Sequence, residues 1–238
     1  MSPSKDGTGT KGSRATGSRG SVSRRELAVA RVLDPARERA EGKVKAFLDA
    51  ALELVNSDSG QDFTVQEVIE RSGQSLRSFY QHFDGKYELL LALFEDAVHT
   101  AAIDLRAVVA ESSSPIDGLH RFAVEYFHVC QPSPKARTQK KGFAPAFANF
   151  AQQLLTEHPQ EASHAFVPVT EIVVDLLDRA AAAGQIRSGL RHARIAGVVL
   201  QAIMFNAFAA TIGGVPVQAG EVDPAEELWD LLVNGIRK

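Results

Sequence analysis

The chain has 238 residues, of which 45% are hydrophobic, enough for one large domain or for a small module joined to a larger one. Its only cysteine, Cys130, excludes an intrachain disulfide and a cysteine-based zinc cluster. The N-terminus has no apolar segment of the kind that directs secretion, so we expect a cytoplasmic protein.

Charge is distributed unevenly along the chain. The net charge is −3, but residues 1–45 hold 11 Lys and Arg against 5 Asp and Glu, whereas residues 46–238 hold 15 against 24. A surface that binds a polyanion is therefore expected toward the N-terminal end. Residues 1–23 are mostly Ser, Gly and Thr with scattered basic residues and little apolar surface to bury, and we predict a disordered basic tail over residues 1–33.

Capping signals mark the first helices. Asp34 followed by Pro35 predicts the start of the first helix, whose apolar face then includes Phe47. Thr64 and Glu67 form a capping box that opens a short second helix. Ser72-Gly73 ends that helix, and Ser75 caps a third.

From Lys86 onward the apolar spacing is helical almost throughout. One helix is predicted from Lys86 to Ala110, and others over 116–130, 144–157, 163–183 with a break near Pro168, 191–212 and 224–236. The β-branched stretch around Pro168 resembles a strand, but Pro168 disfavours a central strand and the residues that follow keep helical phase. The predicted fold class is all-α, with no convincing strand.

Two capped short helices joined by a Ser-Gly turn form a candidate helix-turn-helix, in which the second helix enters the DNA major groove. Leu76, Phe79 and Phe83 are spaced to face the core beside the preceding helix. Five polar residues are then left for solvent or DNA: Arg77, Ser78, Tyr80, Gln81 and His82. Arg and Gln can bond base edges, while Ser, Tyr and Lys can donate to phosphates.

The run from Thr64 to Leu90, TVQEVIERSGQSLRSFYQHFDGKYELL, resembles the DNA-binding signature of the TetR family of bacterial transcriptional regulators. The resemblance implies an N-terminal three-helix DNA-binding domain over residues 34–84 and a helical bundle for effector binding and dimerisation over 85–238. It implies DNA-binding roles for Thr64, Ser75, Leu76, Arg77, Ser78, Tyr80, Gln81, His82 and Lys86. Of these, Leu76, Arg77 and Gln81 would lie nearest the bases, and Arg77 replaces a residue that is usually small in the family.

Residues 101–238 hold eight of the 13 phenylalanines. They either fill a core or, as the resemblance implies, line an effector pocket between helices. Candidate ligand-binding residues are His120, Phe122, Tyr126, Phe127, Phe147, Phe150, Phe166, Phe205 and Asn206. The aromatic content favours a small hydrophobic effector. The basic residues 135–141 either form a solvated loop or help to bind an anionic effector such as an acyl-CoA.

Residues 193–212 are apolar nearly all round, but Arg194, Gln201 and Asn206 interrupt the run, so a membrane span is not expected. Such a helix must be buried on more than one side. Packing against a second copy, together with residues 224–236, would give a homodimer, with Ala196, Gly197 and Ala202 permitting close approach.

The sequence therefore predicts a homodimeric, ligand-responsive transcriptional repressor that binds a palindromic double-stranded DNA operator and is released by a small hydrophobic effector, with no cofactor. No metal site, nucleophile elbow or phosphate loop is found, so an enzyme is not expected. The alternatives are a DNA-binding regulator without a ligand and a helical lipid-binding protein or enzyme.

Overall fold

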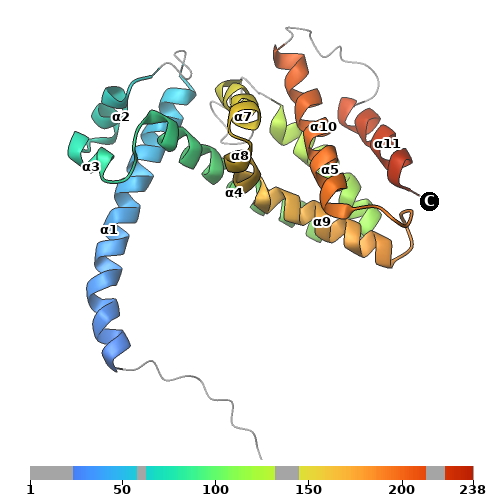
Figure 1. Ribbon diagram of the computed structural model, residues 1–238, viewed down its shortest axis with the longest axis horizontal. Helices are drawn as coiled ribbons and strands as arrows, with labels where there is room; N and C mark the ends of the chain where they lie inside the picture. Colours follow the sequence, from blue (N-terminus) through green and yellow to red (C-terminus); the bar gives the residue numbers. More distant parts are fainter. Residues whose placement is uncertain (1–23, 58–62, 132–144, 213–222, 238) are drawn as a thin grey trace, which may run out of the picture. The chain divides into compact units, whose positions relative to one another are not determined.

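The computed structural model describes residues 24–57, 63–131, 145–212 and 223–237 (Figure 1). The helices are α1 (Arg24–Val55), α2 (Val65–Ser72), α3 (Leu76–Tyr80), α4 (Lys86–Ala110), α5 (Pro115–Cys130), α7 (Pro145–Glu157), α8 (Pro159–Ala165), α9 (Val167–Ala182), α10 (His192–Ile212) and α11 (Pro224–Ile236). Over these described ranges, β pairing is limited to an isolated bridge between Ile186 and Arg237. The predicted all-α fold is confirmed.

Helix α1 begins at Arg24, ten residues before the predicted start, so the prediction of a disordered tail is wrong for residues 24–33. Pro35 lies inside the helix. It cannot donate an amide hydrogen bond, but residues 26–33, ELAVARVL, are mostly good helix formers that extend the helix through it. The described residues divide into two units within α1, between residues 42 and 43. The rest of the predicted tail, residues 1–23, lies outside the described residues.

The helix-turn-helix is built on aromatic side chains. Phe47 of α1 contacts the rings of Phe79 and Phe83 edge to face, with centroids 5.4 and 6.0 Å away, and all three side chains are buried. Such ring pairs contribute about 0.5–1.5 kcal/mol beyond the area that they bury. Helix α3 is therefore held against α1 through Phe79. Figure 1 shows the two helices side by side.

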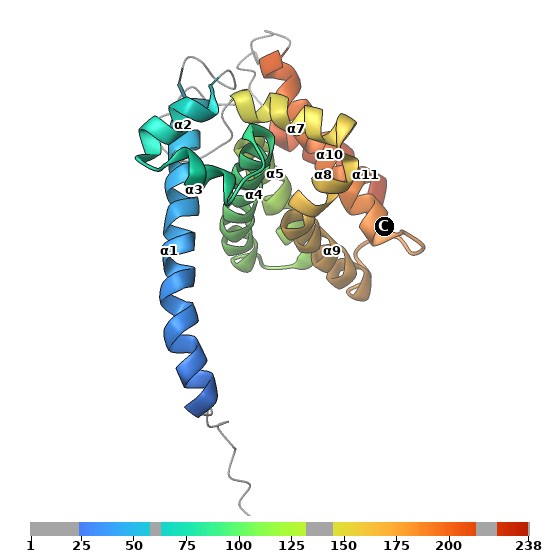
Figure 2. The same ribbon diagram turned by 60° about the vertical axis from the view of Figure 1, so that its left-hand side comes forward.

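Helix α5 is the centre of the bundle, where it contacts α4, α9, α10 and α11. Helix α8 contacts α4, α7 and α9 (Figure 2). The predicted break near Pro168 is confirmed: Phe166 separates α8 from α9, and Pro168 lies in the first turn of α9, where an amide has no partner to lose. Among the described residues, no helix combines the length and the apolarity needed to cross a membrane.

Candidate nucleic-acid interface

The N-terminus of α2 is fixed by the predicted capping box. The Thr64 hydroxyl accepts from the Glu67 amide at 3.2 Å, and the Glu67 carboxylate accepts from the Thr64 amide at 2.6 Å. The Thr64 amide and hydroxyl both donate to the Glu67 carboxylate, and these two hydrogen bonds hold the pKa of Glu67 below its usual range. Gly73 then ends α2 in the left-handed region, with φ of 65°, which a residue with a Cβ adopts at a cost.

Helix α3 presents its polar side to solvent. Ser75 caps it, accepting from the Ser78 amide at 3.1 Å. Arg77 and Gln81 are exposed, and the Tyr80 side chain is 56% exposed although its ring contacts that of Phe79 edge to face. Guanidinium, amide and phenol groups in a row on one helix can donate to base edges and to phosphates.

Two expectations for α3 are wrong. Leu76 was expected in the core but is 51% exposed, so it lies on the outer side of the helix, as the family resemblance implies. Ser78 was expected on that outer side but is only 5% exposed, and its hydroxyl has no hydrogen-bond partner among the described residues. Helix α3 has only five residues, and two adjacent ones, Ser78 and Phe79, are buried. The small side chain of Ser78 fits at such a buried position.

Lys86 begins α4 next to the same surface. Its ammonium lies 4.6 Å from the centroid of the Phe63 ring, a cation–π arrangement that positions the charge beside the start of α2. Phe63 is buried and immediately precedes Thr64. Lys86 and His82 are both half-buried, while Thr64 is exposed. Of the predicted DNA-binding residues, His82 and Lys86 are thus half-buried and Ser78 is buried, and the others are exposed: Thr64, Ser75, Leu76, Arg77, Tyr80 and Gln81.

The predicted effector-binding residues divide into two groups. Phe122, Tyr126, Phe127 and Phe150 are buried and Phe166 is half-buried. The Phe122 and Tyr126 rings are stacked at 5.5 Å. A hydrogen bond links the Tyr126 hydroxyl to the Cys130 sulfur; burial raises the pKa of the tyrosine well above its usual value and that of the thiol to about 12. The side chain of Phe147 lies outside the described residues, as do the basic residues 135–141.

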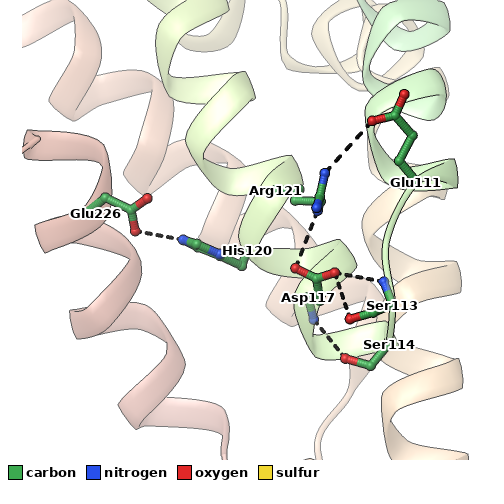
Figure 3. A network of polar contacts seen from close by, with 7 residues as sticks. All are labelled: Glu111, Ser113, Ser114, Asp117, His120, Arg121 and Glu226. Carbon is green, nitrogen blue, oxygen red and sulfur yellow. Dashed lines mark hydrogen bonds and ion pairs between the residues drawn. The ribbon is translucent and has the colours of Figure 1, made fainter.

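Phe205 and Asn206 of that set are exposed on α10, whereas His120 is half-buried between α5 and α11. Phe205 is 43% exposed, and the exposed Asn206 side chain donates to the Ala202 carbonyl at 2.8 Å. Their exposure could not be read from the sequence, because α10 is apolar nearly all round and its sequence period does not distinguish an inner from an outer face. A ligand-binding role for these two residues stays a prediction. His120 pairs with Glu226 of α11 at 2.6 Å (Figure 3). Its ring lies 5.2 Å from that of Trp229.

A shallow surface depression on α9 has a volume of about 400 Å³. Its lining residues are Val167, Thr170, Glu171, Val174, Asp175 and Asp178. None of the predicted ligand-binding residues is among them. The buried aromatic residues of α5 and α7 pack against other side chains in this conformation, as the alternative of a filled core expects.

Sequence reasoning missed the polar contacts between elements distant in the chain. The Tyr87 hydroxyl donates to Glu161, and Arg106 of α4 pairs with Glu171 of α9 at 3.4 Å. These pairs are 74 and 65 residues apart, and no short motif signals them. The sequence also predicted that Ala196 allows a second copy to pack closely. Ala196 is fully buried within its own chain, so a second copy cannot contact it.

Two short capped helices joined by a glycine turn, with buried aromatic rings on one side and exposed polar residues on the other, form a helix-turn-helix, a motif that many proteins use to bind DNA. Residues 47–93 match the sequence profile described as bacterial regulatory proteins, tetR family. Over these residues the chain is therefore similar to the DNA-binding region of the tetR family of bacterial regulatory proteins.

Solved structures share the fold of the chain at low sequence identity. The regulator FadR from Bacillus subtilis, in complex with stearoyl-CoA, is similar with a TM-score of 0.62 and 18% identity, over 81% of this chain and 99% of that one. The fatty acid degradation regulator FadR from Bacillus halodurans gives a TM-score of 0.60 at 14% identity, over 81% and 95%. A TetR family regulator from Marinobacter aquaeolei gives a TM-score of 0.57 at 15% identity, over 85% of this chain and 99% of that one. No curated protein sequence matches the chain.

Proposed function

We propose that the protein is a homodimeric repressor that binds a palindromic operator through α3 and is released by a small hydrophobic effector of the acyl-CoA class. The observation that carries the proposal is the exposed row of Arg77, Tyr80 and Gln81 on a helix whose opposite side is fixed by Phe79. A structural surface helix does not need a guanidinium, a phenol and an amide together, whereas recognition of DNA uses all three.

Exposed apolar residues on the last two helices support a dimer. Val198 and Phe205 lie seven residues apart on α10, so they share a face, and both are exposed. Leu231 of α11 is 72% exposed. Burial of these side chains against a second copy would stabilise the pair and would present two α3 helices to two half-sites of a palindrome.

The buried aromatic residues of the bundle support a hydrophobic effector, and the similarity to a regulator whose structure holds stearoyl-CoA suggests the class. The second candidate function is a regulator without a ligand. It is favoured by one observation: Phe122, Phe127 and Phe150 are packed as a core. An effector would have to displace some of these side chains on entering.

DNA binding is tested with duplexes selected from a random library by the wild-type protein, with Kd measured by gel shift. Arg77→Ala is expected to weaken binding about 10- to 100-fold and to relax sequence preference at one position of the half-site, the loss of one bidentate base contact. Arg179→Ala is the matched control, because it removes one exposed positive charge from α9, distant in the chain from the helix-turn-helix. Equal affinities of the Arg77 and Arg179 variants would refute the assigned reading side of α3.

The effector class is tested with stearoyl-CoA on the protein–DNA complex and on the free protein. Release of the duplex, together with a rise in Tm that grows with ligand concentration, is expected for an acyl-CoA effector. Stable complexes and an unchanged Tm at saturating stearoyl-CoA would support the regulator without a ligand or one with an effector of another class.

A further inference from the structure

Tyr87 connects the start of α4 to a helix far along the chain. It lies in the first turn of α4, directly after Lys86. Its hydroxyl donates to the Glu161 carboxylate of α8, and its ring lies 4.8 Å from the ring of His158 and 6.0 Å from that of Phe150 in α7. Partial burial and the carboxylate raise the pKa of the Tyr87 hydroxyl, so the phenol stays a donor well above neutral pH.

Helix α8 contacts α4, and this contact places Glu161 beside Tyr87. Phe94 lies seven residues after Tyr87 on the same face of α4. Its ring contacts that of Phe150 at 5.8 Å and that of Phe166, which ends α8, at 5.5 Å. The face of α4 that carries Tyr87 is thereby packed along α7 and the junction between α8 and α9.

The first turn of α4 is closely tied to the recognition helix. The amides of His82 and Phe83 both donate to the Phe79 carbonyl at 2.9 Å, so the chain leaving α3 is hydrogen-bonded back to it. The Asp84 amide donates to the carboxylate of Glu88 in the first turn of α4. A displacement of this turn is therefore passed to α3 through a short, bonded segment rather than through a flexible linker.

We propose that Tyr87 is a positioning residue for DNA binding: its hydrogen bond to Glu161 fixes the first turn of α4, and through it the orientation of α3 and the placement of Lys86. This inference rests on the proposed DNA-binding function of α3. When the hydrogen bond is removed, α4 samples more orientations at its start, and the entropy lost on DNA binding increases. The operator affinity should fall while the fold is retained.

The test compares Tyr87→Phe, which removes only the hydroxyl, with Glu161→Ala, Glu161→Gln and the double variant Tyr87→Phe/Glu161→Ala. Ser163→Ala is the matched control, because it removes an exposed hydroxyl from the same helix. On a duplex selected by the wild type, Tyr87→Phe and Glu161→Ala should each bind about fivefold more weakly, at the lower end of measured couplings between sites. The double variant should be no weaker than either single variant, because both remove one bond.

Two readouts separate positioning from a general loss of stability. Glu161→Gln retains an oxygen acceptor and should bind DNA like the wild type. In Tyr87→Phe, backbone hydrogen exchange should rise over residues 76–89 and stay unchanged over α9 and α10, with the Tm close to that of the wild type. Wild-type affinity in Tyr87→Phe, additive losses in the double variant, or increased exchange throughout the bundle would each overturn the assignment.

Failure of the proposed function gives a different result. If the wild-type protein selects no duplex, the DNA-binding proposal fails, and the exchange measurement on free Tyr87→Phe still decides whether the Tyr87–Glu161 bond orders residues 76–89. If the wild type binds its selected duplex and Tyr87→Phe matches it in both affinity and exchange, the positioning role alone is refuted.

Discussion

Gly118 lies in the first turn of α5 where this helix meets α9, and we predict that Gly118→Ala destabilises the bundle. A Cβ atom at this position would lie 2.7 Å from Cδ2 of Leu176 and 3.2 Å from the hydroxyl oxygen of Ser112. Carbon atoms in contact prefer separations of about 3.5–4.0 Å, so the methyl group needs about 1 Å of displacement. Leu176 is fully buried, which leaves it little room to move.

The backbone around Gly118 is also fixed. Ser114 caps α5 by accepting from the Asp117 amide at 3.2 Å, and the Asp117 carboxylate accepts from both the amide and the hydroxyl of Ser113 (Figure 3). Arg121 pairs with the same carboxylate at 3.3 Å. Since neither the helix start nor Leu176 can shift freely, the added methyl group has to be accommodated by strain.

Two opposing effects set the change in the free energy of unfolding that Gly118→Ala causes. Replacing a helical glycine by alanine stabilises the helix by about 1 kcal/mol. Inserting a methyl group into a packed site costs about 1–3 kcal/mol. The overpacking cost should prevail, giving a net loss of about 1 kcal/mol and a Tm lower by about 2–4 °C for a domain of this size.

The assay is urea unfolding of wild type and variants at one fixed protein concentration, since dimerisation would make the stability concentration-dependent. Gly42→Ala is the control: its Cβ would have no neighbour within 4 Å, so it should raise stability by up to about 1 kcal/mol. Leu176→Val removes the obstructing Cδ2 methyl, so Gly118→Ala should cost less in that background. A Gly118→Ala protein as stable as Gly42→Ala would refute the reasoning.

Three further predictions follow from the structure. Phe47→Ala should cost about 3–5 kcal/mol, because this fully buried ring supports Phe79 and Phe83, and should abolish DNA binding while limited proteolysis leaves the α5–α9 core intact. Hydrogen bonds hold the pKa values of Glu67 and Asp117 below their unfolded values. Both carboxylates therefore contribute stability above about pH 4, and this stability is lost as the pH falls through their folded pKa values. In the double variant Glu67→Gln/Asp117→Asn, the free energy of unfolding should depend less on pH between about pH 5 and 3. Leu231→Asp should convert a dimer into a folded monomer in light scattering with unchanged helical circular dichroism, and a persisting dimer would exclude this side chain from the interface.

Element boundaries could be predicted from the sequence wherever local chemistry determines them. Thr64 and Glu67 satisfy the free amides of α2 within four residues, and Gly73 supplies a conformation that the turn requires. Asp223 followed by Pro224 starts α11 by the same logic. The same signal at Asp34-Pro35 failed, because residues 26–33 favour a helix strongly enough to continue it through a proline.

The covered side of a helix could be predicted only where the apolar stripe is narrow. In α4, Leu89, Leu93 and Phe94 are buried as their spacing predicts. Helix α3 has five residues, too few for an apolar stripe to form. Ser78 is therefore buried where exposure was predicted, and Leu76 is exposed where burial was predicted. In α10 nearly every position is apolar, so Phe205 was assigned inward although it faces outward.

The helix-turn-helix separates the residues that fold it from those that would read DNA, and this separation decides which variants are informative. Arg77 is exposed, so its replacement should alter stability by less than about 0.5 kcal/mol, and a loss of affinity would report on DNA contact. Tyr80 is different, because its ring contacts buried Phe79 at 5.3 Å while its hydroxyl end is exposed. Tyr80→Ala would therefore disturb the packing of α3 as well as its surface. Tyr80→Phe keeps the ring contact and removes only the donor, so a phosphate-binding role predicts weaker DNA binding in Tyr80→Phe at unchanged Tm.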